Sequence, residues 1–318
     1  FEPLRPGYAR LRLPLPEVRP AILGHGEFAA FNQTVTQRFA GWRAAATEQL
    51  TAFGKDGHPK ALIERIAEEL LGAFHDAPLL DAYDVYQHLM DYWAETMQDD
   101  AYLIAADGWV AKTSRILETD KKGKTKDKGW TCELIPKPYV VARYFAEEQA
   151  GIDAAQAEVE ASVAGRAELE DEHGGEEGFL GALDKIGKAE VSARLREIRR
   201  DDEARDEAAV LQRWLELSEG ETALKRAVKE QEAALDRLAY AKYPTLTESE
   251  IKALVVDDKW MVRLSAAAQG ELERVSQTLN GRVRELAERY ATPLPQLVDE
   301  VALLSAQVEE HLKRMGSG

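Results

Sequence analysis

A run of lysines between Lys121 and Lys128 is the densest group of chemically active side chains in the chain. Five lysines and one aspartate lie within these eight positions, which gives a local positive charge. The short apolar segments on either side, Ile116–Leu117 and Cys132–Ile135, predict a β-hairpin with this run at its tip. A solvated tip is one interpretation, and contact with nucleic-acid phosphates is the other. The candidate phosphate contacts are Lys121, Lys122, Lys124, Lys126 and Lys128.

Side chains that could act as nucleophiles or metal ligands are few and scattered. Cys132 is the only cysteine. The neighbouring carboxylate of Glu133 disfavours a thiolate, so we expect Cys132 to be a buried structural residue of the strand. The residues of types that metals use share no recognised ligand spacing, and we expect no metal site. They are His58, His75, Asp76 and Asp91.

Two further patterns resemble binding sites but favour structural roles. The glycine-containing segment Phe53–Gly57 does not follow a predicted strand, so we interpret it as a turn between helices rather than a phosphate loop. A stripe of large side chains could stack on bases, as aromatic residues do in single-strand binders. At helical spacing such a stripe is more typical of a core. Its members are Tyr83, Tyr86, Met90, Trp93 and Met97.

The acidic composition restricts the partners of the chain. Asp and Glu outnumber Lys and Arg by 57 to 41 over 318 residues, which gives a formal net charge of −16. Such a surface repels nucleic-acid phosphates and anionic lipids, so contact with DNA requires a local basic patch or a partner. One cysteine excludes a disulfide framework, and no apolar run reaches the ~18 residues that a membrane helix needs. We expect a cytoplasmic protein without membrane contact.

Residues 1–150 predict a mixed, mostly helical region. The alternation of apolar and basic residues over Tyr8–Leu13 predicts an edge strand, whose partner we expect upstream of Phe1. Helical periodicity lapses over residues 102–138, where the basic β-hairpin is expected. Amphipathic helices are predicted to begin near Ala21, Pro59 and Leu79.

Residues 151–244 predict a coiled-coil hairpin with a mixed-charge insertion. Residues at alternating spacings of four and three define the seam of one helix, and an earlier apolar segment supplies the facing helix. Between them, Ala182–Trp214 is densely charged, so we expect an exposed, mobile helical segment there. The seam residues are Leu224, Val228, Gln231, Leu235 and Leu238, and the facing residues are Val159, Val163 and Leu169.

Residues 245–318 predict a C-terminal helical assembly region. Thr247 and Glu250 have the spacing of a capping box at a helix start. Two amphipathic helices joined at Thr292–Pro293 are expected to form a helical hairpin, whose narrow apolar stripes need further helices alongside. The candidate partner-interface residues are Leu272, Val275, Leu279, Val283, Leu286, Leu297, Val301, Leu304, Val308 and Leu312.

These patterns together predict a mainly α fold. It comprises a helical domain with a small β-hairpin, a coiled-coil helical hairpin and a C-terminal pair of amphipathic helices. No pattern within it provides a catalytic, cofactor-binding or metal-binding residue.

Several long stretches carry a family resemblance. They are Leu79–Trp93, Leu134–Pro136, Ala142–Phe145, Lys242–Pro244, Leu254–Trp260, Gly270–Leu272 and Thr292–Pro295. They resemble the C-terminal part of the modification subunit of type I restriction-modification systems, which are adenine-N6 DNA methyltransferases. The resemblance extends over most of the chain, from about Gly7 to Met315.

The resemblance implies methyl transfer from S-adenosylmethionine to adenine N6, by an α/β domain with an Asn-Pro-Pro-Tyr/Phe motif and a glycine-containing cofactor motif. The chain has no Pro-Pro pair, and its asparagines, Asn32 and Asn280, lie in Asn-Gln and Asn-Gly. We therefore expect both motifs to lie before Phe1. The chain itself is expected to be an inactive fragment without catalytic residues.

The resemblance also implies partners. In the family, C-terminal helices of two modification subunits pack on the helical spacers of a DNA specificity subunit, and a restriction subunit can join the complex. DNA would then be contacted through the complex, and this chain is expected to serve docking on the specificity subunit and clamping of the DNA. Two alternatives remain open: a free-standing coiled-coil scaffold that self-associates without an enzymatic role, and a module that binds DNA through its lysines.

Overall fold

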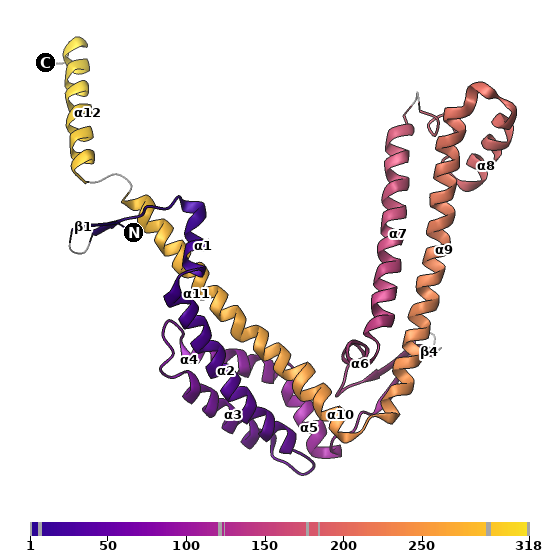
Figure 1. Cartoon of the computed structure of the whole chain (residues 1–318), viewed down its shortest axis with the longest axis horizontal. Coiled ribbons are helices and arrows are strands. Elements are labelled where there is room, and N and C mark those ends of the chain that lie inside the picture. Colours follow the sequence, from indigo (N-terminus) through magenta and orange to yellow (C-terminus); the bar gives the residue numbers. More distant parts are fainter. Residues whose placement is uncertain are drawn as a thin grey trace. The chain divides into compact units, whose positions relative to one another are not determined.

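The computed structural model describes residues 2–5, 8–119, 123, 125–175, 178–183, 185–290 and 294–316. It confirms a mainly α protein with a small β-hairpin (Figure 1). The chain divides into two compact units, one formed by Phe1–Gly108 together with Lys259–Gly318 and the other by Trp109–Asp258. The first unit therefore brings together two segments that are far apart in sequence.

The first unit is built mainly of helices from both of its segments. Its strands β1 and β2 pair antiparallel with each other, so the predicted edge strand has a partner within the chain. In chain order the elements are β1 (Glu2–Arg5), β2 (Tyr8–Arg10), η1 (Leu15–Glu17), α1 (Val18–Leu23), α2 (Gly26–Ala52), α3 (Pro59–Phe74), α4 (Ala82–Tyr92), η2 (Trp93–Met97), α5 (Gln98–Asp107), α11 (Val262–Arg289) and α12 (Leu294–Arg314).

Helices α2 and α3 form as the apolar spacing predicts. Pro59 is the first residue of α3, where its missing N–H costs nothing. Trp42 of α2 is buried, and its Nε1 donates to the Ile66 carbonyl across the interface, 2.9 Å away. The segment Phe53–Gly57 is the inter-helix turn predicted, and a side chain at Gly57 would collide with the Phe53 ring. The buried face of the pair comprises Phe28, Phe31, Val35, Trp42, Leu50, Leu62, Ile63, Ile66, Leu70 and Phe74.

The predicted core stripe of the third helix was partly wrong. Tyr83 is 70% exposed, and Tyr86 and Met90 are only half-buried. The helix is π-helical over Trp93–Met97, which shifts the side chains that follow relative to a regular α-helix. Helix α5 then continues to Asp107, so the predicted end of helical structure at Tyr102 was also wrong. The observed buried face is Val85, Leu89, Tyr92, Trp93, Met97, Ala101 and Ile104.

A buried ion pair joins the two segments of the first unit. The Lys259 Nζ lies 2.7 Å from Asp100 Oδ2, and both side chains are 5% exposed. The Trp260 Nε1 donates to the same Asp100 oxygen at 2.8 Å, and the Tyr92 hydroxyl donates to the Lys259 carbonyl at 3.1 Å. Burial raises the pKa of Asp100, although the Lys259 charge and hydrogen bond oppose the shift. The Lys259 cation and the Trp260 donor therefore offset part of the cost of burying this carboxylate.

Lys259 and Trp260, which both donate to Asp100, lie in a segment of unusual helix type. They lie in η6 (Ala253–Met261), which is π-helical, and the boundary between the two units falls inside this segment. A π-helix has a wider turn than an α-helix, and such segments are rare enough that they usually have a specific role. Here the wider turn accompanies the placement of two neighbouring donors on one carboxylate.

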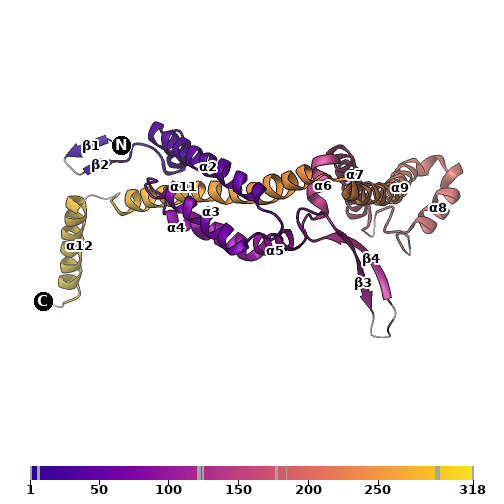
Figure 2. The ribbon, with the colours of Figure 1, turned by 90° about the horizontal axis from the view of Figure 1, so that it is seen from below.

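The second unit consists of a β-hairpin and a long pair of helices (Figure 2). Strands β3 and β4 are antiparallel, with Thr113 opposite Cys132, so the predicted hairpin is confirmed. Cys132 is 2% exposed, as expected of a structural residue. The elements are β3 (Thr113–Thr119), β4 (Thr125–Cys132), α6 (Lys137–Tyr144), α7 (Ala146–His173), α8 (Lys188–Glu197), η3 (Ile198–Arg200), η4 (Asp202–Ala204), α9 (Arg205–Lys242), η5 (Tyr243–Thr245) and α10 (Glu248–Lys252).

Helices α7 and α9 run side by side (Figures 1 and 2) and bury a seam between them. The seam differs from the predicted one in its second half. Val228 and Leu235 are buried as expected, but Gln231 and Leu238 are exposed, and Ala239 lies in the seam instead. On the facing helix Ile152 is buried and Val159 packs against the cluster.

The mixed-charge stretch is not the exposed segment that its composition suggested. Helix α8 packs on α9 around a second apolar cluster. Trp214 is 2% exposed, and its Nε1 donates to Glu170 at 2.8 Å. A few apolar residues are enough to form this cluster, because three separate segments of the chain bring them together. The buried members are Leu180, Val191, Ile198, Leu211 and Trp214.

The capping box at Thr247 is confirmed. The Thr247 hydroxyl accepts from the Glu250 N–H, and the Glu250 carboxylate accepts from the Thr247 N–H at 2.8 Å. Lys242 and Tyr144 also donate to Glu250, each at 3.0 Å. The Thr247 backbone hydrogen bond, together with these donors, lowers the pKa of Glu250 to about 2.

Removal of the lysine of the buried pair is predicted to destabilise the first unit. Lys259→Ala leaves Asp100 buried and without its cation, which costs about 3–5 kcal/mol in comparable cases. The measurement is chemical denaturation followed by circular dichroism. Lys60→Ala, at an exposed position on α3, is the control and should change the free energy of unfolding by less than about 0.5 kcal/mol. Equal effects of the two substitutions would contradict this role of the ion pair.

Acid is predicted to weaken the start of α10 through Glu250. Its pKa is lowered in the folded chain from 4.5 to about 2, so the stabilisation is complete above the unfolded value and is lost as the pH falls through this interval. Glu250→Gln should therefore lower the Tm by a constant amount above about pH 5, and the difference should disappear towards pH 2. Thermal scans across this range test the prediction. A difference that is independent of pH would contradict it.

Candidate partner-binding surface

The apolar stripe of α12 is uncovered. All five stripe residues are exposed, by 43% at Leu297 and up to 62% at Val301. Every side chain described in α12, from Leu297 onward, is exposed, so this part of the helix buries no apolar face within the chain. Isolated helices of this length are marginal in water, and a helix with such a stripe gains its stability from a packing partner. The stripe comprises Leu297, Val301, Leu304, Val308 and Leu312.

The stripe of α11 changes from interior to surface along the helix. Val275 is 7% exposed and Leu272 is half-buried, so both belong to the interior of the first unit. In the part of α11 around Leu272 and Val275, helix α1 packs on α11, and Arg19 forms an ion pair with Glu273. Further along, Leu279 and Val283 are half-buried and Leu286 is 37% exposed. Only the last three predicted interface residues of α11 are therefore available to a partner.

The two C-terminal helices are present, but they do not form the packed hairpin that was predicted. The exposure of every stripe residue of α12 shows that α11 does not cover it. The free part of the α11 stripe, Leu279–Arg289, is about 16 Å long, whereas the 21 residues of α12 extend for about 31 Å. Even a complete fold-back would cover only about half of α12. The rest of the stripe needs another molecule.

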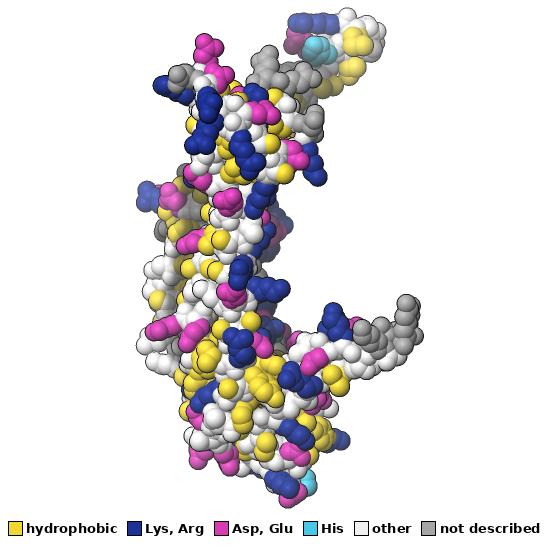
Figure 3. All heavy atoms as spheres, turned by 90° about the vertical axis from the view of Figure 1, so that its right-hand side faces the viewer, with side chains coloured by type: hydrophobic (Ala, Val, Ile, Leu, Met, Phe, Trp, Pro, Cys, Tyr) yellow, Lys and Arg dark blue, Asp and Glu magenta, His cyan; other side chains and the backbone are white. Residues whose placement is uncertain are grey.

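The basic hairpin is confirmed as an element, whereas three of its lysines lie outside the described residues. These are Lys121, Lys122 and Lys124. Of the other two, Lys128 pairs with Glu118 at 2.8 Å, and Lys126 lies opposite Glu118 in the strand register. The face in Figure 3 shows Lys and Arg interspersed with Asp and Glu. Phosphate contact by the tip therefore stays a prediction.

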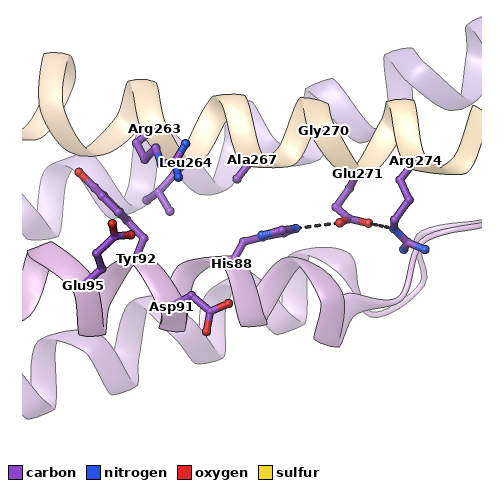
Figure 4. Close-up of a pocket in the computed structure, with 10 residues that line it drawn as sticks. All are labelled: His88, Asp91, Tyr92, Glu95, Arg263, Leu264, Ala267, Gly270, Glu271 and Arg274. Carbon is purple, nitrogen blue, oxygen red and sulfur yellow. Dashed lines mark hydrogen bonds and ion pairs between the residues drawn. The ribbon is translucent and has the colours of Figure 1, made fainter.

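A polar groove between α4 and α11 was not predicted from sequence. Its volume is about 440 Å³, and ten residues line it (Figure 4). At one end the His88 Nε2 lies 2.7 Å from Glu271 Oε1, and Arg274 donates to the other Glu271 oxygen at 2.6 Å. Burial raises the pKa of Glu271, but the hydrogen bonds from His88 and Arg274 lower it by more, so the pKa lies below its ordinary value.

The charged residues of the groove hold two helices together and do not form a reactive site. Arg274 also reaches Asp84 at 2.5 Å, so its charged groups join α4 to α11. The partners are 183 and 190 residues apart in sequence, and no local spacing could have indicated them. Within the described ranges no group of three or more His, Cys, Asp or Glu residues could hold a metal ion. The groove offers no nucleophile with an adjacent base.

Substitutions along one predicted stripe are expected to separate interior residues from surface residues. Val275→Ser removes a buried side chain of α11 and should cost about 2 kcal/mol in the free energy of unfolding. Val308→Ser, the same change at a 57% exposed position of α12, should cost less than about 0.5 kcal/mol. Denaturant titration of both variants gives the comparison. A large cost at Val308 that does not depend on protein concentration would show that α12 packs within the chain.

Comparisons with known proteins identify no relative. No family model, no curated protein and no solved structure matches the chain. Across the part of the chain that the structure describes, no helix combines the length and the apolar character needed to cross a bilayer. The uncovered stripe of α12 is the feature that calls for a partner.

Proposed function

We propose that this chain is the C-terminal assembly region of a type I restriction-modification adenine-N6 DNA methyltransferase subunit, and that it docks on the DNA specificity subunit. The resemblance of long stretches, from Leu79–Trp93 to Thr292–Pro295, supports the family. The observation that carries the docking role is the exposed stripe of α12. In the family the C-terminal helices meet the helical spacers of the specificity subunit, so the expected occupant is itself helical.

The spacing of the α12 stripe suits a helical occupant. Its residues follow one another at intervals of four, three, four and four, which is the pattern of helices that pack in register along their length. Complete burial of a Val or Leu side chain contributes about 1.5–3 kcal/mol relative to exposure. A stripe of five such residues is therefore a sufficient anchor for a stable complex, although ordering of the partners offsets part of that gain.

The methyl-transfer chemistry is assigned to residues outside this chain. The family motif has no counterpart here, because Asn32 and Asn280 are followed by Gln33 and Gly281. In the family the cofactor is bound by an α/β domain with a glycine-containing motif, and the described strands form only two-stranded antiparallel sheets. The groove beside His88 does not fit the cofactor either, because its charged groups are engaged with one another.

The other partners follow from the same proposal. A second modification subunit and a restriction subunit would join through the complex, and DNA would meet the assembly rather than this acidic chain alone. The lysines of the β3–β4 hairpin are the proposed phosphate contacts within the complex. Because Lys128 is paired with Glu118, the contribution is expected mainly from the tip.

The alternative, a free-standing coiled-coil scaffold, has less support from the second unit than its sequence pattern suggested. The α7–α9 seam is closed within the chain, with Val228, Leu235 and Ile152 buried. The buried residues of this seam are therefore not available for self-association, although Val163 and Leu238 beside them are exposed. A scaffold role would therefore also depend on α12.

Loss of α12 is predicted to abolish docking. A chain truncated after Tyr290 should fold, because the described side chains of α12 are exposed, yet it should not co-purify with a co-expressed specificity subunit. The double substitution L304D/V308D in the full chain should have the same effect by placing charges in the stripe. Ala306→Asp is the matched control, since it places a charge on the opposite side of the same helix. Co-purification of the truncated chain at the level of the intact chain would contradict the proposal.

A further inference from the structure

We infer that α12 also pairs with α12 of a second copy of this chain, antiparallel and about a two-fold axis at Ala306. This inference does not rest on the proposed function. It rests on the symmetry of the exposed stripe and on the charges beside it. A homodimer interface of this type must be self-complementary, so that each residue meets its counterpart in both directions.

The exposed stripe meets this condition at its centre and, when it is continued to Met315, at both ends, while Leu312 lies on one flank of the paired helices. In an antiparallel pair centred on Ala306, Leu304 of each copy lies opposite Val308 of the other, because the two residues are equally far from the centre. Val301 is likewise opposite His311, and Leu297 is opposite Met315. All of these side chains are exposed in the single chain, where Met315 is 78% exposed. Leucine therefore meets valine at the centre, in layers typical of a coiled coil.

The charged residues beside the stripe select the antiparallel orientation. Residues that flank a coiled-coil seam form ion pairs between helices and determine their orientation. Glu300 and Arg314 flank the same side of the stripe, fourteen residues apart. In the antiparallel pair each Glu300 lies beside Arg314 of the other copy, so the ion pair forms twice. In a parallel pair Glu300 would lie beside the neutral Ser305.

On the flank of the stripe opposite Glu300 and Arg314, the antiparallel pair gains further apolar contact. Val298 and Leu312 are 58% and 45% exposed, and antiparallel pairing places them beside each other at both ends. Arg314 has only one ion pair within the described chain, with Glu310 at 2.5 Å, and its side chain is 71% exposed. An exposed pair of this kind contributes little, so its exchange for Glu300 of the second copy costs little.

The dimer is expected to be reversible. The stripe from Leu297 to Met315 is about 27 Å long, which is short for a permanent interface. Association should therefore depend on protein concentration. The same residues would be occupied in a complex with a specificity subunit, so the two assemblies would exclude each other. In the absence of a specificity subunit, the homodimer would then keep the α12 stripe buried.

The first test is a charge swap in the full chain, read by sedimentation equilibrium. Glu300→Arg and Arg314→Glu should each raise the dimer dissociation constant about five-fold, since each disrupts two ion pairs. The double variant E300R/R314E should return to within about two-fold of the unchanged chain, because the swapped charges pair again. Glu309→Arg is the matched control on the outer side of α12 and should have no such effect.

The second test is cross-linking, which reports the orientation. Cys132 is replaced by serine, and chains carrying Leu304→Cys or Val308→Cys are treated with a short bis-maleimide, separately and as a mixture. Antiparallel pairing predicts the mixed product, whereas a parallel pair predicts that each variant links to itself. A chain truncated after Tyr290 should be monomeric.

Several results would overturn the inference. They are a monomer at all concentrations, a dimer that survives the truncation, single charge variants that behave like Glu309→Arg, and cross-links between identical positions. None of these experiments contains a specificity subunit. Failure of the docking proposal would therefore leave the homodimer standing, and failure of the homodimer would leave docking untouched.

Discussion

The buried pair of Asp100 and Lys259 is the interaction on which the first unit depends. It joins residues that are 159 positions apart, with both side chains 5% exposed, and Trp260 and Tyr92 complete its hydrogen bonds. A buried charge is tolerated only when it is matched, so this pair specifies where the last segment of the chain re-enters the unit. The His88–Glu271 contact then continues the attachment of α11 to α4.

Attachment along α11 also explains why the C-terminal surface is free. The first half of the α11 stripe is used inside the unit, where Val275 is buried, and only the part beyond Leu279 remains. This remainder is too short to cover α12. The docking proposal and the homodimer are two uses of the same uncovered side chains, one by a helical partner and one by a second copy. Both proposals have the same physical basis, because burial of an apolar stripe that is exposed to water is favourable.

Sequence reasoning predicted elements well where the pattern was local. The capping box at Thr247, the proline start of α3 and the β3–β4 hairpin depend on residues within a few positions of one another. It predicted burial less well where helix type changed or where distant residues met. Tyr83 was assigned to the core because it shares the spacing of the stripe, but it lies in the first turn of α4 and is exposed, before the π-helical turn at Trp93–Met97. The cluster around Trp214 was missed because its charged surroundings conceal a few apolar residues.

The helical class, most helix starts and the apolar stripe of α12 could be predicted from the sequence, because periodicity and capping are local properties of the chain. The tertiary packing of the helices determines which apolar stripes are buried. It buried Val275 and left Val308 in solvent, although the two residues have the same type and the same pattern. It also placed Asp100 beside Lys259 and His88 beside Glu271, where each pair joins distant segments of the chain. Contacts between residues more than a hundred positions apart leave no trace in local spacing, because they depend on how whole helices pack.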